Sequence, residues 1–574
     1  GRPQHILTST SSHSCDNGGA GDTGNKMMKI KARFAAFAAA MLAAVLCLAA
    51  CNGGVGGGDD STVATTAEPP LTFTRGDAAG YVIVIGSNAT SGEREAAITL
   101  SDAFRLRLGI DLEVTADDGE TTETEMIVGN TSRGVPAAWG TDAHRTGDWF
   151  AGAEGKKVWF IGGSDAATEN AVNGFIEKIL LKADDGITLG EPLVHYASSR
   201  LGSITLNGDK EMKNIKFGLP DTKSFTREVA GILADAVTGC YGYEATIAGD
   251  GEAADILLTT AELSPEYAGV LGDRAAVLTS VAGKAALVGR DQASLVFAMN
   301  RLTAELDSLT ALEIKDGEIA FEYSADDTVC AMSFNVLGGA DITQRQPAVL
   351  CVIADEMPDF FGIQEGKEKW ILYLNSKLGG VYATVGKGNA ESGYTETYNN
   401  IYYRTDRFTL VEGDTVWLSE TPGVPDTKFS MSKRVRTATY ALLREKSTGR
   451  EVLAVSVHLD NASNEARLKQ ADVLIDLIKR YNCTVAVVGD FNSSETSEVH
   501  SKMAAVLADS RTDAAARDTA PTYNHLGEGK GSVLDYIFIT KGMEITEYRV
   551  HTGLYKGKVY PSDHNAIAAV FRLG

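Results

Sequence analysis

Short apolar runs and amphipathic segments alternate along most of the chain. Runs such as YVIVIG (81–86) and KKVWFIGG (156–163) have the length and composition of buried strands. The segments that follow them, 93–109 and 168–181, carry apolar residues at helical spacing. Strands that alternate with helices in this way predict an α/β protein.

The segment from 71 to 325 contains a degenerate internal repeat. KKVWFIGGSDAATENAV and KAALVGRDQASLVFAM match element for element. The second copy starts near residue 204, and we expect in it helices over 224–239 and 292–306 and strands over 254–260 and 284–290. The repeat therefore predicts two tandem α/β domains, 71–200 and 201–325.

One stretch of the first copy, EMIVGNTSR (125–133), loosely resembles the accessory domain that precedes the catalytic domain in some bacterial glycoside hydrolases. That resemblance would imply a glycan contact by residues 71–325. A purely structural spacer explains the same pattern, so both interpretations stay open.

The N-terminal pattern is that of an export signal. Residues 1–26 do not begin with Met and are interpreted as an upstream, non-native segment. Residues 27–51 combine a basic start with the apolar run FAAFAAAMLAAVLCLAAC and small residues at its end, as a signal peptide does.

The end of this run, LAAC, resembles a bacterial lipobox, so Cys51 is expected to be lipidated. The stretch 52–70 is polar and rich in Gly, which predicts a flexible linker. We therefore expect an extracytoplasmic protein that is lipid-anchored to a bacterial membrane, at the cell surface or in the periplasm.

Charge restricts the possible partners. The 574-residue chain has a formal net charge of -23 at pH 7, and most of this charge lies before residue 326. Neutralising the phosphates of bulk DNA requires clustered Lys and Arg, so the composition argues against a protein that coats nucleic acid. The seven cysteines show no CxxC spacing, which argues against a thiolate zinc site.

Chemistry-bearing side chains gather after about Asp326, at the ends of apolar runs. Six apolar runs each have one or two such residues at or near one end. They are Asn335 in 328–339, Glu365 in 360–366, His458 in 452–461, Asp490 and Asn492 in 484–492, Asp535 in 532–540, and Asp563 and His564 in 560–571. A single strand-end Asp or Asn is usually a turn former, but six successive strands of this kind are hard to explain as turns. In GDFN, residues 490 and 492 would face the same side of an extended tip, with Phe491 turned into the core.

The motifs SFN, QE, YR, HLD, GDFN, LDYIF and SDH occur in the order typical of the endonuclease/exonuclease/phosphatase family, which segment 328–574 therefore resembles. The resemblance implies a DNase I-like catalytic domain over 326–574. Its fold would be a four-layer α/β sandwich, with two mixed sheets packed face to face and helices outside. The active site would lie where the strand ends converge.

The resemblance also implies a metal site. Glu365 matches the main Mg²⁺ carboxylate of the family, and Asn335 and Asp563 would complete the metal environment. Oxygen ligands of this kind suit Mg²⁺ or Mn²⁺ better than zinc.

Five further positions match catalytic residues of the family. Asp490 corresponds to the residue that orients or deprotonates the attacking water, and Asn492 to a donor to the phosphate. His458 and His564 correspond to the pair that binds the scissile phosphate, and Asp535 to the carboxylate that fixes His564.

Other residues have less certain tasks. Tyr403 matches a phosphate-side position, but packing is an equal alternative. His525 lies in a loop where substrate selectivity could arise. Asp460, Arg467 and Gln470 either brace the site or touch substrate, and the basic cluster 433–436 is interpreted as a solvated loop.

One position departs from the family pattern. Some family nucleases have a glutamate seven residues before the Arg of the YR pair, and it partners the first histidine. Thr397 occupies that position here and Glu396 is one residue away, so either a bulge brings Glu396 in or His458 has another partner.

These observations favour a membrane-anchored, metal-dependent phosphoesterase that acts as a monomer on a phosphomonoester or phosphodiester. Its substrate would be a nucleic acid, a lipid headgroup or a small phosphodiester. The alternatives are an extracellular nuclease and a glycan-binding surface protein whose catalytic domain is inactive.

Overall fold

The computed structural model describes residues 71–573 apart from 184–185, 209, 221–223, 307, 317–318, 323–327, 340, 390–395, 529–530 and 556–558. The predicted upstream segment, signal peptide, lipidated Cys51 and linker 52–70 lie outside the described residues. Within the described part of the chain, no helix combines the length and the apolar character needed to cross a bilayer.

The first α/β domain is built on a six-stranded sheet of order β3-β2-β4-β6-β5-β8. Its strands are β2 (Val82–Ile85), β3 (Val114–Ala116), β4 (Glu125–Val128), β5 (Trp149–Glu154), β6 (Lys157–Gly162) and β8 (Leu193–His195). β1 (Leu71–Thr74) and β7 (Gly186–Leu189) form a separate pair, and α2 (Arg75–Ala78) is a single turn. The two long helices, α3 (Ser91–Leu108) and α4 (Asp165–Lys178), pack together through the stacked rings of Phe104 and Phe175.

The second α/β domain has the same topology, as the aligned segments predicted. Its sheet order is β12-β11-β13-β15-β14-β17, and parallel and antiparallel pairs fall at the same places as in the first sheet. The strands are β11 (Ile215–Gly218), β12 (Ala245–Ile247), β13 (Ile256–Thr260), β14 (Ala276–Val281), β15 (Lys284–Gly289) and β17 (Ile319–Phe321). The helices are α5 (Ser224–Tyr241), α6 (Ala268–Leu271) and α7 (Gln292–Leu306), and β9 (Ser203–Leu206), β10 (Lys210–Glu211) and β16 (Ala311–Ile314) form a small additional sheet.

Sequence patterning missed several strands of these two domains, among them the antiparallel strands β5 and β14. β5 and β14 precede β6 and β15 through tight turns at Gly155 and at Ala282-Gly283, all of which have positive φ. Turns with left-handed residues match the twist of a hairpin, so these residues were the local signal for the missing strands.

The C-terminal domain has two mixed sheets. The first has the order β20-β21-β19-β18-β30-β29-β27 and the second β22-β23-β24-β25-β28-β26. The first contains β18 (Thr328–Asn335), β19 (Phe360–Gln364), β20 (Tyr382–Val385), β21 (Ile401–Arg404), β27 (Ala516–Arg517), β29 (Ile545–His551) and β30 (Ala566–Arg572). The second contains β22 (Phe408–Trp417), β23 (Thr437–Glu445), β24 (Glu451–His458), β25 (Thr484–Asp490), β26 (Leu507–Asp509) and β28 (Asp535–Thr540).

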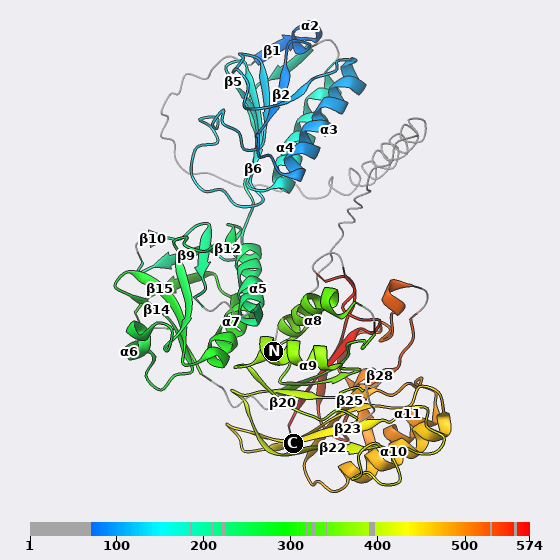
Figure 1. Cartoon of the computed structure of the whole chain (residues 1–574). Coiled ribbons are helices and arrows are strands. Elements are labelled where there is room, and N and C mark those ends of the chain that lie inside the picture. Colours follow the sequence, from blue (N-terminus) through cyan, green and yellow to red (C-terminus); the bar gives the residue numbers. More distant parts are fainter. Residues whose placement is uncertain are drawn as a thin grey trace, which may run out of the picture. The chain divides into compact units, whose positions relative to one another are not determined.

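Figure 1 shows the strands of this domain and the helices beside them. Alternation of side chains along the strands creates its layers. On β18, Val329 and Ala331 face the core between the sheets, whereas Cys330, Met332 and Phe334 face an outer core. α8 (Ile342–Glu356) and α9 (Glu368–Leu378) cover the outer face of the first sheet, and α10 (Asn464–Ile478) and α11 (Glu498–Val506) cover the second. The predicted four-layer α/β sandwich is therefore present in the C-terminal part of the chain.

Strand direction brings the predicted site residues to one end of the sandwich. The parallel neighbours β24 and β25 end together at His458 and Asp490, and the antiparallel strand β28 begins beside them at Asp535. In the other sheet β18 ends at Asn335, β19 ends just before Glu365, and β30 begins just after His564. Polar residues far apart in the sequence therefore meet at this end.

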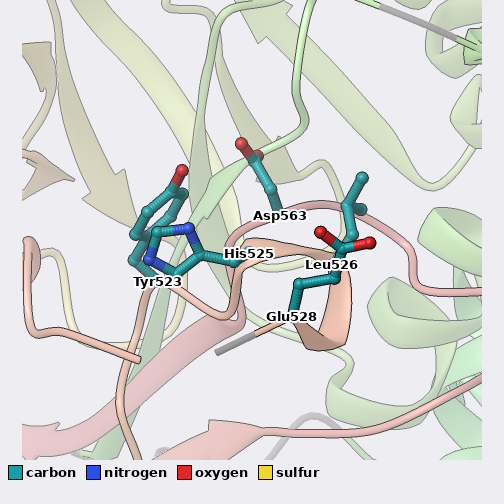
Figure 2. Close-up of a pocket in the computed structure, with 5 residues that line it drawn as sticks. All are labelled: Tyr523, His525, Leu526, Glu528 and Asp563. Carbon is teal, nitrogen blue, oxygen red and sulfur yellow. The ribbon is translucent and has the colours of Figure 1, made fainter. Parts of the chain in front are cut away.

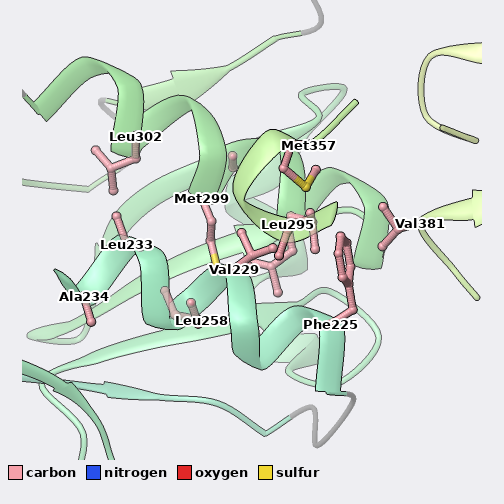
Figure 3. Close-up of a cluster of buried hydrophobic side chains, with 14 of the residues drawn as sticks. Phe225, Val229, Leu233, Ala234, Leu258, Leu295, Met299, Leu302, Met357 and Val381 are labelled. Carbon is pink, nitrogen blue, oxygen red and sulfur yellow. The ribbon is translucent and has the colours of Figure 1, made fainter. Parts of the chain in front are cut away.

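The second α/β domain and the C-terminal domain share one apolar core. Phe225 and Val229 from α5 and Leu295 and Met299 from α7 belong to the same buried cluster as Met357, which follows α8 (Figure 3). The ring of Phe225 packs edge-on against Tyr382, with ring centroids 5.9 Å apart. Lys377 on α9 also donates a hydrogen bond to Ser224 on α5, at 2.9 Å.

We predict that Phe225→Ala lowers the free energy of unfolding by about 3–5 kcal/mol, because it leaves a cavity in place of a fully buried ring. The thermal midpoint from calorimetry measures the effect. Leu372→Ala on α9 is the control, because Leu372 is 64% exposed and should be nearly neutral. Equal midpoints for the two variants would contradict a shared core.

Candidate active site

Asp490 is the central carboxylate of the convergent strand ends. Its Oδ2 accepts a hydrogen bond from Asn335 Nδ2 at 3.1 Å, and its Oδ1 accepts one from the backbone N–H of Asn492 at 2.8 Å. The Nε2 atoms of His458 and His564 lie 3.5 and 3.8 Å from Asp490 Oδ2. Burial and the neighbouring charge of Asp535 raise the pKa of Asp490 to about 7, although the charge of His564 opposes this shift.

His564 belongs to a chain of hydrogen bonds that keeps it protonated. Its Nδ1 donates to Asp535 Oδ2 at 2.8 Å, and the same oxygen accepts a hydrogen bond from the hydroxyl of Thr522 at 2.7 Å. Burial lowers the pKa of His564, but the carboxylates of Asp535, Asp490 and Asp563 outweigh it and raise the pKa to about 10. The imidazole is therefore a charged donor at neutral pH.

His458 has the opposite environment. Its Nε2 lies 3.0 Å from Asn492 Nδ2, which can only donate, so this nitrogen is the acceptor of a neutral ring. Burial, with the charges of Arg436 and His564, holds the pKa of His458 well below its usual value. Two histidines on either side of one carboxylate thus have different charges.

The backbone is strained at two of the site residues. Glu365 and Asn492 follow β19 and β25 with φ of 55° and 48°, in the left-handed region. Asn tolerates this conformation better than Glu does, and such strain persists where the surrounding structure enforces it. The tip after Asp490 is therefore a turn rather than the extended segment we predicted, although Phe491 is buried in the core as expected.

Glu365 and Asp563 add negative charge beside Asp490. The Oε2 of Glu365 accepts a hydrogen bond from the backbone N–H of Gly338 at 3.1 Å. Burial raises the pKa of Asp563, and the charge of Glu365 raises it further. The Glu365 charge also contributes to the raised pKa of Asp490, so the three carboxyl groups repel one another.

Arg345, on α8, pins the loops that carry these acids. Its guanidinium donates to the backbone oxygens of Val336, Leu337 and Pro561, at 2.6–2.8 Å. Those loops follow Asn335 and precede Asp563. The arginine thus holds the two sides of the acidic region together.

The residues at this end fit a divalent cation. The ligand atoms of Asp490, Asp535 and His564 all lie within 4.8 Å of one another, so these residues form a group that could hold a metal ion. In this group Asp535 already accepts hydrogen bonds from two partners, and His564 is protonated. The mutually repelling acids Glu365 and Asp563 suit a hard cation better, because they supply the oxygen ligands that Mg²⁺ and Mn²⁺ prefer.

The structure brings together all eight of the predicted metal and catalytic positions and one of the two predicted substrate positions. His525 lies beside the site, with its ring 4.1 Å from that of Tyr523. Tyr403 does not lie there: it pairs with Phe360, at the opposite end of β19 from Glu365, and packs in the core between the sheets.

Asp460, Arg467 and Gln470 stabilise the loop after His458 through hydrogen bonds. The carboxylate of Asp460 accepts hydrogen bonds from four backbone N–H groups, those of Lys433, Arg434, Ala462 and Ser463. The side-chain oxygen of Gln470 accepts a hydrogen bond from the Asp460 N–H at 2.8 Å, and Arg467 donates one to the backbone carbonyl of Asp460 at 3.0 Å. They shape the loop after His458.

Glu396 does not replace the missing family glutamate at position 397. Its side chain lies against Gly388, where an added Cβ would be 2.1 Å from Glu396 Oε1, and Thr397 accepts a hydrogen bond from Asn389. His458 has Asn492 as its partner instead. This settles the question that the sequence left open.

Three residues of the site were not predicted. Thr522 supports Asp535, the ring of Tyr523 lies 4.8 Å from that of His564, and Arg436 lies near His458. In the sequence, Thr522 and Tyr523 are marked only by their place in the loop TYNH (522–525), which ends at the predicted His525. Arg436 is buried, so the interpretation of 433–436 as a solvated loop was wrong at this residue.

At the candidate site, two packed sheets carry acids, amides and histidines where their strand ends meet. The sequence profile described as the Endonuclease/Exonuclease/phosphatase family matches residues 332–564, so the C-terminal region carries a domain of this family. Phosphoester substrates are what this family implies. Comparison with curated proteins gives no match.

Solved structures similar to the chain include three from Bacteroides. An endonuclease/exonuclease/phosphatase from Bacteroides vulgatus is 25% identical over 43% of this chain and 99% of its own, with a TM-score of 0.41. A family protein from Bacteroides thetaiotaomicron is 26% identical over 42% and 97%, with a TM-score of 0.40. A mannosyl-6-phosphatase from the same organism is 25% identical over 43% and 99%, with a TM-score of 0.39.

We predict that His564 titrates near pH 10 in the metal-free protein and that Asp535→Asn lowers this pKa by more than one unit, because the carboxylate charge is lost. Imidazole NMR in EDTA measures it, with the signal assigned by comparison with His564→Gln. A wild-type pKa near 6.5 would contradict the assignment.

The same shift predicts a pH-dependent stability. A raised folded-state pKa stabilises the protein fully below the ordinary pKa of about 6.5, and this stabilisation is lost as the pH rises through about 10. The difference in unfolding free energy between wild type and Asp535→Asn should therefore shrink between these two pH values.

Proposed function

We propose that the C-terminal domain is a Mg²⁺- or Mn²⁺-dependent phosphoesterase in which Asp490 activates the attacking water. The observation that supports this best is the pair of histidines, one cationic and one neutral, around one buried carboxylate. Groups whose environments push their pKa values apart are the usual signature of an acid and a base in one site.

Asp490 is suited to be the base. A carboxyl group with a pKa of about 7 can accept a proton from water near neutral pH, and Asn335 and the Asn492 N–H fix its orientation. As the water oxygen bonds to phosphorus, the bond from phosphorus to the alcohol oxygen breaks. The leaving oxygen takes a proton from solvent, and Asp490 later returns to solvent the proton that it accepted from the attacking water.

His564 is suited to stabilise the charge that develops. Its cationic ring offers Nε2 as a donor, while Asp535 and Thr522 hold the other nitrogen. The neutral His458 and the amide of Asn492 provide a second, uncharged contact for a phosphoryl oxygen.

Glu365, Asp563 and Asn335 would hold the metal ion. When bound, a divalent ion polarises the phosphoryl oxygens and offsets their negative charge. The neighbouring carboxylates of this chain would also repel one another less, so the ion should stabilise the folded site.

The two other functions have less support. A nuclease would need cations along its groove, but acidic side chains border the described part of this site. An inactive glycan-binding protein would have no need for the hydrogen bonds that Thr522 and His564 donate to Asp535, which keep His564 charged.

We predict that Asp490→Asn and His564→Ala each lower kcat by about 10² or more, since general acid–base and electrostatic contributions are of this size. Because both act in one step, the double variant should lose much less than the product of the single losses. Single-turnover hydrolysis of bis-p-nitrophenyl phosphate and p-nitrophenyl phosphate at saturating Mg²⁺ measures this.

Asp472→Asn is the control for this experiment, because Asp472 lies exposed on α10 and should leave kcat unchanged. Thermal midpoints separate lost catalysis from lost folding. A folded single variant that retains more than about a tenth of the wild-type kcat would refute the assignment.

The metal assignment predicts that Glu365→Gln weakens Mn²⁺ binding by at least about tenfold and abolishes Mg²⁺-dependent activity, because an amide is a poor ligand for a hard dication. Isothermal titration with Mn²⁺ measures the binding independently of turnover. Glu368→Gln, three residues further on and exposed, should bind Mn²⁺ as the wild type does. Full activity in excess EDTA would exclude a metal requirement.

A further inference from the structure

A pocket of about 390 Å³ opens beside His564. Tyr523, His525, Leu526, Glu528 and Asp563 line it (Figure 2). Asp563 is the neighbour of His564 in sequence, so a group bound in this pocket would lie next to the reacting phosphate.

The loop that forms the pocket is firmly attached to the catalytic segment. The backbone N–H of Asn524 donates to Asp563 O at 2.7 Å, and the Asn524 side chain donates to Ser562 O and Asn565 Oδ1, at 3.2 and 2.8 Å. Bridge pairing joins Tyr523 to both Ser532 and His564. The pocket wall therefore keeps its position relative to the histidine.

Two adjacent residues of this loop are strained. His525 and Leu526 have φ of 54° and 56°, although neither is Gly or Asn. The Asn524 side chain accepts the Leu526 N–H at 2.7 Å, which holds this turn. Strain that local bonds maintain at a pocket wall points to a function for the side chains it projects.

The lining chemistry is aromatic, apolar and acidic. The rings of Tyr523 and His525 lie 4.1 Å apart, and the side chain of Leu526 is 44% exposed. Two carboxyl groups, those of Glu528 and Asp563, complete the wall (Figure 2). None of the five described lining residues is Lys or Arg.

We infer that this pocket takes the alcohol part of the phosphoester and that this part is a neutral, polyhydroxylated group such as a sugar. Ring faces and Leu526 suit its C–H surface, and carboxylates accept hydrogen bonds from its hydroxyl groups. A second phosphate or a carboxylate on the substrate would meet the carboxylate of Glu528 and be repelled. The inference rests on the proposed phosphoesterase function and restricts its substrate class.

The test compares two substrates of similar size, glucose 6-phosphate and 6-phosphogluconate, of which the second carries an extra carboxylate. Wild-type kcat/KM should favour glucose 6-phosphate by at least about tenfold. Glu528→Lys should reduce this preference by at least about tenfold, because the charge that repels the carboxylate becomes one that attracts it. Glu262→Lys, the same change at an exposed position of the second α/β domain, should leave the preference unchanged.

Hydrolysis of p-nitrophenyl phosphate distinguishes a failure of the proposed phosphoesterase function from a failure of the pocket inference. Absence of this hydrolysis would overturn the phosphoesterase function itself. Normal hydrolysis of p-nitrophenyl phosphate by both enzymes, together with an unchanged preference in Glu528→Lys or a wild-type preference for 6-phosphogluconate, would overturn the pocket inference alone. Tyr523→Leu gives a second measurement. This variant should raise KM for glucose 6-phosphate more than KM for a small ester without a sugar ring, such as methyl phosphate. Equal changes in the two KM values would contradict stacking of the sugar on Tyr523.

Discussion

The buried carboxylate of Asp490 is the group on which the arrangement of the catalytic domain depends. It is only 2% exposed, and a carboxylate removed from water is costly unless hydrogen-bond donors or cations replace the solvent. Its donors come from residues 335 and 492, and its two histidine neighbours from residues 458 and 564. Both sheets must therefore be assembled, in register, before this group is satisfied.

The two sheets meet this requirement through close backbone packing. At Gly489, just before Asp490, an added Cβ would lie 2.1 Å from the carbonyl oxygen of Val457, so only Gly allows β25 to lie in this position beside β24. The register of β25 then places Asp490 opposite His458 on one side and Asp535 on the other. A shift by one residue would turn these side chains to the other face of the sheet.

The sequence predicted the strand ends well because burial leaves a strong period-two pattern, and each polar residue interrupted an apolar run at its end. The internal repeat could be recognised because the same order of apolar and amphipathic segments occurs twice, and the two sheets have the same strand order. Tyr403 shows the limit of a motif: YR places the residue on the correct strand but does not reveal that it lies at the far end from Glu365. Arg436 and Thr522 could not be found because their proximity to His458 and Asp535 depends on how the chain folds and not on the spacing of the motifs.

The left-handed turn at Asn492 was also beyond the reach of pattern analysis, since periodicity describes which side a residue faces and not the sign of φ. The same turn lets one amide contact both His458 Nε2 and Leu459 O, at 3.0 and 3.1 Å. The neutral state of His458 thus follows from the backbone of the neighbouring strand. The spacing of the motifs therefore predicts where His458 lies but not whether it is charged.

The packing of the second α/β domain reaches the site through one helix. α5 contributes to the buried cluster that also contains apolar residues of α8, and α8 carries Arg345. Arg345 in turn holds the carbonyls of Val336, Leu337 and Pro561, which flank Asn335 and Asp563 in sequence. The second α/β domain therefore covers the helix that fixes the spacing of two candidate metal ligands.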